Sequence, residues 1–268
     1  MLNHPTYERL IQLRLHGMAQ ALAEQTQTPE VQALSFEERL GLLVEREATE
    51  RHNRQTSSRL RRARLKQAAV AEDIDYRHPR GLDRPLFRRL LTGEWVRGHQ
   101  NVLLTGPTGV GKTYLACALA NAACRQGHTA LYQRLPRLLE ELTLAHADGR
   151  YLQLMAALSK VDVLVLDDWG LAILDDERRR DLLELLDERY QARSTVITSQ
   201  LPVAHWHEAL GDATLADAIL DRLVHCAHPI TLSGESLRKV KGSLTLAEGL
   251  GSGPIDPRGA PSALTAGT

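Results

Sequence analysis

A glycine-rich turn, placed between an apolar run and a helix-forming segment, limits the folds open to this chain more than any other feature. The segment 103–116, LLTGPTGVGKTYLA, contains the pattern G-x-x-x-x-G-K-[ST] in full. In this pattern the glycines let successive backbone N–H groups face a phosphate, and the N-terminus of the following helix adds positive potential. The loop works only between a strand and a helix, so it predicts an α/β fold.

Each part of the turn has a predicted contact. Lys112 is expected to reach the β- and γ-phosphates of a nucleotide, and the Thr113 hydroxyl to complete a Mg²⁺ shell. The predicted nucleotide contacts are Gly106, Pro107, Thr108, Gly109, Val110, Gly111, Lys112 and Thr113. A chance match in an ordinary glycine turn is the alternative, and the flanking strand and helix patterns argue against it.

Beyond residue 101 the chain alternates between short β-rich runs and longer helical segments. The expected strands are residues 101–105, 129–133, 161–166, 194–199 and 229–232. This alternation predicts a parallel sheet covered by helices on both faces. Aromatic residues make up only 4% of the chain, which argues against a β-sandwich and for packing on leucine and alanine.

The first part of the chain is predicted to be helical. Ile11, Leu15, Met18 and Leu22 recur at the spacing of one helix face. Ser35 with Glu38 forms a capping-box pattern that starts a second helix. The basic stretch RLRRARLKQAAV is expected to continue as a third helix.

These patterns divide the chain into four parts. Residues 1–75 are expected to form a small helical domain for DNA or partner binding, dimerisation or assembly, and residues 76–100 a linker and entry segment broken by two prolines and a glycine. Residues 101–243 are expected to form the nucleotide-binding domain. Residues 244–268, rich in Gly, Pro, Ser and Ala, are expected to be a disordered tail.

Basic residues are concentrated in one block, although the formal net charge of the chain is zero. Between Arg51 and Arg89 twelve basic residues face four acidic ones, a net charge of +8. Such a block is typical of a contact with a polyanion, and a solvated helix face is the equally open alternative. The predicted nucleic-acid contacts are Arg54, Arg59, Arg61, Arg62, Arg64 and Lys66.

Composition argues against several other classes of protein. No apolar run approaches the roughly 20 residues that span a bilayer, and the first fifteen residues lack the pattern of an export signal. Three cysteines without close pairing argue against a disulfide framework as the basis of the fold and favour a cytoplasmic location.

Polar residues at the ends of two expected strands add catalytic candidates. Asp167 and Asp168 end the apolar run VDVLVLDD, where a carboxylate beside the phosphate loop can assist Mg²⁺. Asp167 is the predicted metal-side residue, and Asp168 is predicted to polarise the attacking water, with a capping role as its alternative. Gln200 ends the run STVITSQ and is the candidate for sensing the γ-phosphate, although a plain polar strand end is also possible.

Five motifs then follow one another in a recognisable order. They are NVLLTGPTGVGKTYLACALANAACRQG, VLVLDDWG, ITSQLP, ADAILDRLVH and LSGESLRK, preceded by LRLHGMAQAL and LSFEERLGLLVEREATER. In this order the chain resembles the IstB-like ATP-binding proteins, helper ATPases encoded beside the transposase in a class of bacterial insertion sequences. More distantly it is similar to the DnaC helicase loader and the DnaA initiator of the AAA+ superfamily. The resemblance extends to about residue 241.

The resemblance implies further site residues. Asp167 with Asp168 matches the Walker B pair, and Asp168 is shorter than the usual glutamate, which implies slow hydrolysis. Arg222 falls at the arginine-finger position, acting on ATP bound to a neighbouring subunit, and Arg238 falls at the sensor-II position. From the residues alone, the favoured interpretations are that Arg222 is an intrahelical partner of Asp217 or Asp221 and that Arg238 is a plain surface charge.

The resemblance also implies a fold and a function. The fold is a P-loop AAA+ ATPase domain, a parallel sheet flanked by helices, with a small all-helical N-terminal domain. The implied function is an ATP- and Mg²⁺-dependent protein that oligomerises with itself on double-stranded DNA, largely independently of sequence, and assists a transposase. A DnaC-like helicase loader is the alternative, and a small-molecule kinase would leave Arg222 and Arg238 without a role.

Overall fold

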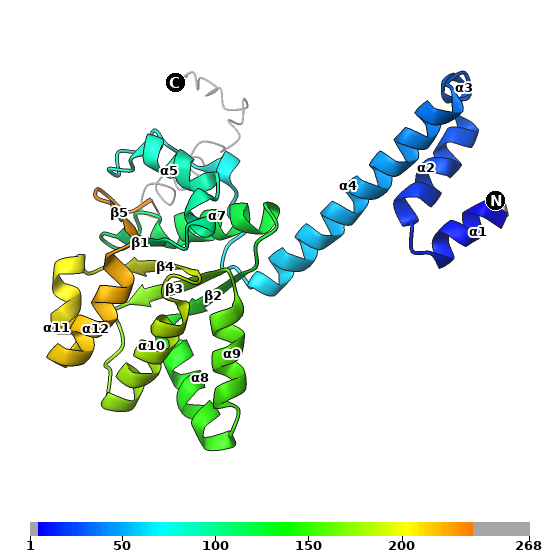
Figure 1. The fold of residues 1–268 in the computed structure, drawn as a ribbon. Helices are drawn as coiled ribbons and strands as arrows, with labels where there is room; N and C mark the ends of the chain where they lie inside the picture. Colours follow the sequence, from blue (N-terminus) through cyan, green and yellow to red (C-terminus); the bar gives the residue numbers. More distant parts are fainter. Residues whose placement is uncertain (1–4, 238–268) are drawn as a thin grey trace, which may run out of the picture.

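A sheet of parallel strands forms the centre of the larger part of the molecule (Figure 1). The computed structural model describes residues 5–237. The strands are β1 (Asn101–Thr105), β2 (Ala130–Arg134), β3 (Val163–Trp169), β4 (Ser194–Ser199) and β5 (Ala227–Thr231). Their order is β2-β3-β4-β1-β5, and every neighbouring pair is parallel. The prediction of a parallel sheet is confirmed, with strand ends shifted by up to three residues.

Side chains on successive strand positions enter two separate cores, one on each face of the sheet. On β1, Val102 and Leu104 join the first core, and Leu103 joins the second. On β3, Val165 and Leu166 divide between the two cores in the same way. This continuous apolar character, with period-two alternation between two buried faces, is typical of a parallel sheet covered on both sides.

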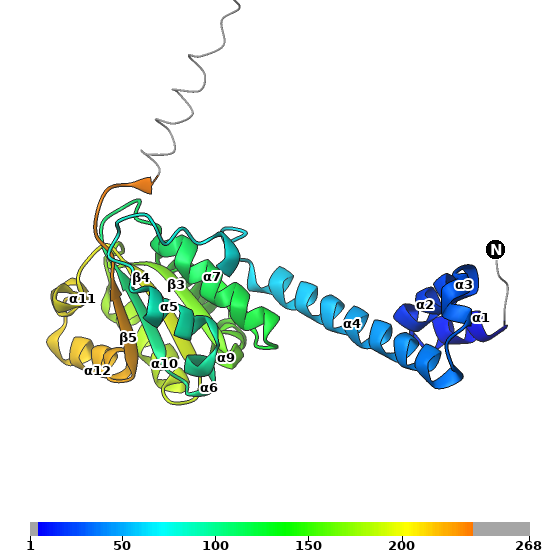
Figure 2. The ribbon, with the colours of Figure 1, turned by 90° about the horizontal axis from the view of Figure 1, so that it is seen from above.

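The helices cover the two faces in different numbers. One face carries α5 (Arg84–Leu91), α6 (Glu94–Arg97) and α7 (Lys112–Arg125). The other carries α8 (Leu135–Asp148), α9 (Tyr151–Lys160), α10 (Asp176–Arg189), α11 (Trp206–Leu210) and α12 (Ala213–Val224), with a 3₁₀ turn at Val203–His205 (Figure 2). Because every neighbouring pair of strands is parallel, the carboxyl ends of all strands lie at one edge.

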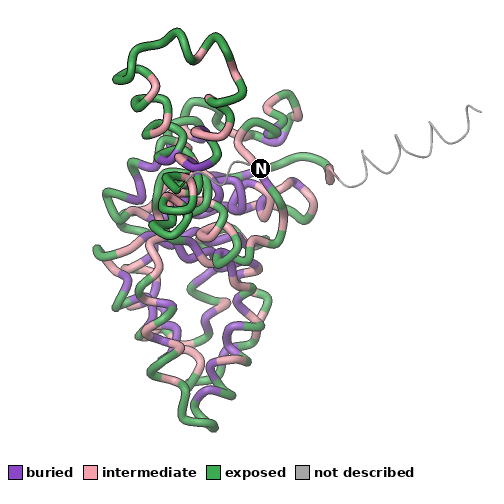
Figure 3. Tube along the Cα trace, turned by 90° about the vertical axis from the view of Figure 1, so that its right-hand side faces the viewer, coloured by how far each residue is buried: buried purple, intermediate pink, exposed green. Residues whose placement is uncertain are grey.

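A long helix carries the N-terminal helices away from the sheet (Figure 1). The N-terminal elements are α1 (Pro5–Gln12), α2 (His16–Gln27), α3 (Pro29–Gln32) and α4 (Phe36–Ala63). The capping box that begins α4 is confirmed, because Glu38 N–H donates to Ser35 Oγ and Ser35 N–H donates to the Glu38 carboxylate. Most residues of this arm are exposed, and the buried residues are concentrated in the sheet domain (Figure 3).

The arm is held together by a small interface between α2 and α4. Ala19 and Ala21 are buried there, and the Glu47 carboxylate accepts hydrogen bonds from the backbone N–H groups of Gly17 and Met18. Glu47 therefore satisfies the free amides at the start of α2 and compensates the positive end of its dipole.

One predicted helix is in fact two. The apolar spacing of residues 11–22 predicted a single helix, but α1 ends at Gln12 and α2 begins at His16. Arg14 adopts a left-handed conformation, with φ of 60°, which a continuous helix does not allow. The prediction was wrong because the same apolar spacing fits two short helices, of which α1 packs against α2 and α2 packs against α4.

The expected boundary between the two domains is also displaced. The helix of the basic stretch ends at Ala63, where Arg64 is left-handed with φ of 50°, and residues 64–75 contain only a 3₁₀ turn at Ala71–Asp73. Ala69 and Ile74 belong to the core on the α7 face of the sheet. The division at residue 75 and the linker 76–100 are therefore corrected: the chain enters the sheet domain near Ala63, and α5 and α6 are part of it.

Within the described range of 5–237, no helix combines the length and the apolar character that crossing a membrane requires. The residues from 238 onward, which include Arg238 and the expected tail 244–268, lie outside the described structure.

We expect the link between α8 and α10 to weaken as the pH rises. His146 Nε2 lies 3.0 Å from Asp181 Oδ1, and this contact raises the pKa of His146 above 6.5. A raised pKa contributes stability that is complete below 6.5 and is lost as the pH rises through the folded-state value. Because the His146–Asp181 pair is partly exposed, its contribution to the free energy of unfolding is at most about 1 kcal/mol. Urea unfolding from pH 5.5 to 8.5 measures it, and His146→Gln removes this component; an unchanged pH profile in that variant would contradict the assignment.

Candidate nucleotide-binding site

The glycine-rich turn lies at the carboxyl edge of the sheet, where β1 ends at Thr105 and α7 begins at Lys112. Three of its glycines have positive φ angles, a backbone conformation that residues with a side chain rarely adopt. Gly106, Gly109 and Gly111 have φ angles of 141°, 91° and 95°. These conformations let the loop curl around a small anion while its N–H groups point inward.

Packing against the chain beyond β5 also demands glycine. A Cβ atom on Gly106 would lie 2.2 Å from the carbonyl oxygen of Leu232, and one on Gly109 would lie 2.1 Å from Ser236 Oγ. The backbone N–H of Leu237 donates to the carbonyl of Gly109 at 3.0 Å. The loop is thus held from behind by residues 232–237.

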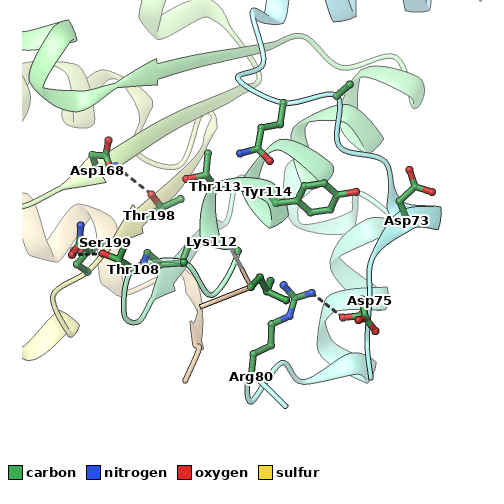
Figure 4. A pocket seen from close by; sticks show the side chains of 16 residues that line it. Asp73, Asp75, Arg80, Thr108, Lys112, Thr113, Tyr114, Asp168, Thr198 and Ser199 are labelled. Atoms are coloured by element: carbon green, nitrogen blue, oxygen red, sulfur yellow. Dashed lines mark hydrogen bonds between the residues drawn. The ribbon is translucent and has the colours of Figure 1, made fainter. Parts of the chain in front are cut away.

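A cavity of about 600 Å³ opens beside the loop (Figure 4). Its walls come from the loop and the start of α7, from the ends of β3 and β4, and from the segment between α4 and α5. Lining residues include Gln67, Asp73, Arg80, Thr108, Lys112, Thr113, Tyr114, Asp168, Thr198 and Gln200. Its size suits a nucleotide, since ligand pockets in proteins span roughly 300–1,000 Å³.

Lys112 is largely buried and folds back over the loop. Its Nζ donates to the carbonyl oxygens of Gly106 and Pro107 at 2.7 and 2.8 Å. This geometry keeps the ammonium group at the mouth of the phosphate cradle, where it can transfer its hydrogen bonds to phosphate oxygens.

The Asp167 carboxylate forms the centre of the polar part of the site. It is fully buried, and Thr113 Oγ1 donates to its Oδ1 at 2.9 Å. Tyr132 Oη donates to Oδ2 at 2.5 Å, Thr198 donates to Oδ1, and Lys66 Nζ lies 3.4 Å from Oδ2. Four side chains from separate parts of the chain therefore converge on one carboxylate.

These contacts keep Asp167 ionised. Burial alone would raise its pKa, but hydrogen bonds from Thr198, Tyr132 and Thr113, together with the charge of Lys66, outweigh burial and hold the pKa below 3.8. Burial and the hydrogen bond to Asp167 raise the pKa of Tyr132, so its hydroxyl remains a neutral donor. The carboxylate is thus an anionic acceptor beside the phosphate loop at neutral pH.

Asp168 faces the cavity from a strained backbone. It has a left-handed φ of 67°, and its N–H donates to Thr198 Oγ1 at 3.2 Å. Its carboxylate accepts a hydrogen bond from Arg134 Nε at 2.8 Å. Backbone strain of this kind is typical of functional sites; Asp168 lines the cavity, while the carboxylate of Asp167 points toward α7.

Gln200 directly follows β4 and lies beside the phosphate loop. Its side-chain Oε1 accepts a hydrogen bond from Thr108 Oγ1 at 2.8 Å, and both residues line the cavity. The structure therefore brings six predicted residues together at one edge of the sheet: Thr108, Lys112, Thr113, Asp167, Asp168 and Gln200.

Arg222 lies at the opposite edge of the sheet from the loop. The carbonyl oxygens of Arg222 and Leu223 accept hydrogen bonds from the side chain of Asn101, the first residue of β1. The guanidinium of Arg222 donates through Nε to Asp187 Oδ1 at 2.6 Å and through Nη1 to the carbonyl of Ala218. Arg222 therefore cannot act on a nucleotide in its own loop.

The six basic residues predicted to contact nucleic acid separate into two groups. Arg54, Arg61, Arg62 and Arg64 are exposed at the end of α4. By contrast, Arg59 is half-buried and its Nε donates to the carbonyl of Cys124 in α7 at 2.9 Å. Lys66 belongs to the Asp167 cluster, as described above.

Several residues of the site had no sequence signal. Tyr132 and Arg134 come from β2, where the register places Arg134 beside Asp167. Arg80 is buried, and its guanidinium donates to the carbonyls of Val110 and Asp75 at 3.2 and 3.0 Å. The strand order would have revealed the first two, because β2 and β3 are neighbours, but the sequence alone does not provide that order.

The strand order, with the phosphate loop at the end of a strand inside the sheet, defines a P-loop nucleotide-binding domain of the AAA+ type. Among solved structures, that of DnaI is similar at a TM-score of 0.55 with 26% sequence identity, covering 66% of this chain and 93% of that chain.

The family model for the IstB-like ATP binding protein matches residues 8–245. An insertion-sequence ATP-binding protein of Sinorhizobium fredii, y4pL, is 55% identical over 239 residues, which are 89% of this chain and 98% of that protein. The insertion sequence IS21 ATP-binding protein of Pseudomonas aeruginosa is 37% identical over 230 residues, 86% of each chain. The chain belongs to the IstB-like ATP-binding protein family.

We expect substitutions of the loop glycines to separate backbone strain from collision. Gly106→Ala adds a methyl group against the fixed carbonyl of Leu232 at a φ of 141°, whereas Gly127→Ala meets nothing within 4 Å at a φ of 101°, which is also positive. Gly127→Ala, the control, should lower the free energy of unfolding only by the strain of a positive φ, on the order of 1 kcal/mol. Gly106→Ala should lower it by at least twice as much. Urea unfolding compares the two, and equal destabilisation would show that the collision with Leu232 is relieved.

Proposed function

We propose that this protein hydrolyses ATP, assembles with itself on double-stranded DNA and assists a transposase in the movement of an insertion sequence. The observation that carries the proposal is the Thr113–Asp167 contact beside a complete phosphate loop in a member of this family. The names of the relatives, which describe insertion-sequence ATP-binding proteins, support the link to transposition.

The loop and its neighbours fit a nucleotide with a divalent cation. Residues 108–111 offer backbone N–H groups to the phosphates, because Pro107 has no N–H and that of Gly106 donates to the carbonyl of Ser199, and Lys112 offers its ammonium group. Thr113 Oγ1 and Asp167, the latter through water, are the groups that would hold Mg²⁺, because hydroxyl and carboxylate oxygens are its preferred ligands. When bound, Mg²⁺ neutralises charge on the β- and γ-phosphates.

Hydrolysis is assigned to the residues that face the cavity at the ends of β3 and β4. Asp168 is placed to polarise the attacking water, and its ion pair with Arg134 holds its carboxylate in the absence of substrate. Gln200, beside Thr108 across the loop, is placed to contact the water or the γ-phosphate. The short side chain of Asp168 supports slow hydrolysis.

Arg222 is assigned to a neighbouring subunit's nucleotide. Its place at the edge of the sheet opposite the loop supports this, since head-to-tail contact between subunits brings opposite edges together. In the single chain its guanidinium is held by Asp187, so assembly would exchange this partner for phosphate oxygens. Arg238, proposed as the sensor-II residue, lies outside the described residues.

DNA binding is assigned to the exposed end of α4. Within residues 5–237, no carboxylate lies within ion-pair distance of Arg61, Arg62 or Arg64, whereas Arg54 shares Glu47 and Glu50. Arginines without a carboxylate partner can pair with phosphates at little electrostatic cost, and phosphate pairing carries no sequence information. Arg61, Arg62 and Arg64 are therefore the main proposed contacts, with Arg54 next to them.

We expect removal of these charges to weaken DNA binding for all sequences alike. The triple variant Arg61→Gln, Arg62→Gln, Arg64→Gln should lower affinity and reduce the slope of log K against log salt by about 1 for each phosphate that the variant no longer neutralises. Fluorescence anisotropy with duplexes of two unrelated sequences at several salt concentrations measures this. Arg97→Gln, which changes an exposed arginine of α6, is the control. An unchanged salt slope in the triple variant would show that this face of α4 is solvated and does not contact DNA.

We expect Arg222→Ala to separate nucleotide binding from assembly and hydrolysis. The free chain should bind ATP normally, while turnover in the presence of duplex DNA falls about a thousandfold or more, as for other arginine fingers. Asp187→Asn, which breaks the same ion pair but keeps the arginine, should retain turnover. Analytical ultracentrifugation with ATP and DNA reports assembly; ATP-dependent oligomers that form equally well without DNA would favour a protein-loading role over the proposed one.

A further inference from the structure

Lys66 connects the N-terminal arm to the centre of the nucleotide site. It follows the end of α4 by three residues, and its Nζ lies 3.4 Å from Asp167 Oδ2. Its side chain is 42% exposed, whereas the carboxylate it contacts is fully buried. A basic residue next to the arm thus touches the one buried anion on which the polar part of the site depends.

The ammonium group and a metal ion need the same negative charge. Thr113, the proposed metal ligand, donates to Asp167 Oδ1 at 2.9 Å and approaches Oδ2, the oxygen near Lys66, at 3.2 Å. A divalent cation held in this corner would lie within a few ångströms of Lys66 Nζ, where the two positive charges repel strongly in a partly buried site. Binding of one cation therefore weakens the contact of the other.

Other contacts of this junction do not depend on the site. Arg59 Nε donates to the carbonyl of Cys124 at the far end of α7, and Ala63 is completely buried in the core. Beyond Lys66, Gln67 and Ala68 line the cavity itself. The junction thus has a permanent attachment at Arg59 and Ala63 and a second attachment, at Lys66, that responds to charge in the nucleotide site.

We propose that Lys66 is a positioning residue that holds the Asp167 carboxylate while the metal is absent and releases it when Mg²⁺ binds, so that the attachment of α4 differs between the two states. The inference rests on the proposed metal-binding role of Thr113 and Asp167. It assigns Lys66 to communication between the nucleotide site and the arm, in place of a contact with DNA phosphate.

The first test measures the Mg²⁺ concentration that half-saturates binding of a fluorescent, non-hydrolysable ATP analogue. In Lys66→Gln the ammonium no longer competes, so this concentration should fall by up to about fivefold, as for a partly exposed ion pair. Lys66→Arg keeps the positive charge and should stay near the unsubstituted protein. Lys160→Gln, the same change at the end of α9, is the control and should have no effect.

The second test follows the arm without using catalysis. Spin labels are placed on Ser57→Cys in α4 and Gln153→Cys in α9, two exposed positions, after Cys226→Ser removes the exposed native thiol. Distances from pulsed electron paramagnetic resonance should shift or broaden when Mg²⁺ and the analogue are added. In Lys66→Gln the distribution without Mg²⁺ should already resemble the Mg²⁺-bound one.

The outcomes separate this inference from the proposed site. If Mg²⁺ does not change analogue affinity in the unsubstituted protein, the metal-binding role of Thr113 and Asp167 is wrong, and the inference fails with it. If Mg²⁺ acts normally but Lys66→Gln needs as much or more of it, competition by Lys66 is overturned and the proposed site stands. Weaker analogue binding by this variant without Mg²⁺ would also overturn it, because Lys66 would then be a ligand contact.

Discussion

The buried carboxylate of Asp167 is the interaction on which the polar half of this molecule depends. A carboxylate removed from water must be compensated, and here the compensation comes from hydroxyl groups on α7, β2 and β4 and from the ammonium of Lys66. The strands and the helix that carry these groups are thereby joined through their contacts with the Asp167 carboxylate. The cluster that compensates this buried charge also contains the residues proposed to hold a cation.

The direction of the strands determines which residues lie at each edge of the sheet. Because all its strands are parallel, the phosphate loop, Asp168 and Gln200 gather at the carboxyl edge, while Arg222 is fixed at the amino edge. In the assembly proposed above, a single chain carries two halves of a nucleotide site, the phosphate loop and Arg222, that it cannot bring together by itself. This separation is a consequence of strand direction, and no flexible loop is required for it.

Local signals in the sequence were sufficient for the strands, the phosphate loop and the capping box at Ser35, because each depends on neighbouring residues. They failed where the outcome depends on long-range packing. The turn at Arg14 and the end of α4 at Ala63 are set by contacts with distant parts of the chain. Likewise, Tyr132 and Arg134 reach the site only because β2 pairs with β3. A count of basic residues cannot distinguish Arg62, which has no carboxylate partner among residues 5–237, from Lys66, whose ammonium group contacts Asp167.

The length of α4 gives its attachment mechanical importance. With 28 residues, the helix extends about 42 Å from its root near Ala63. A tilt of about 10° at the root would displace the far end by about 7 Å, a lever-arm amplification set only by the rise of an α-helix. A small tilt at the root, such as release of Lys66 is proposed to permit, would therefore be magnified at α1 to α3 to the size of a side chain, without any rearrangement inside the arm.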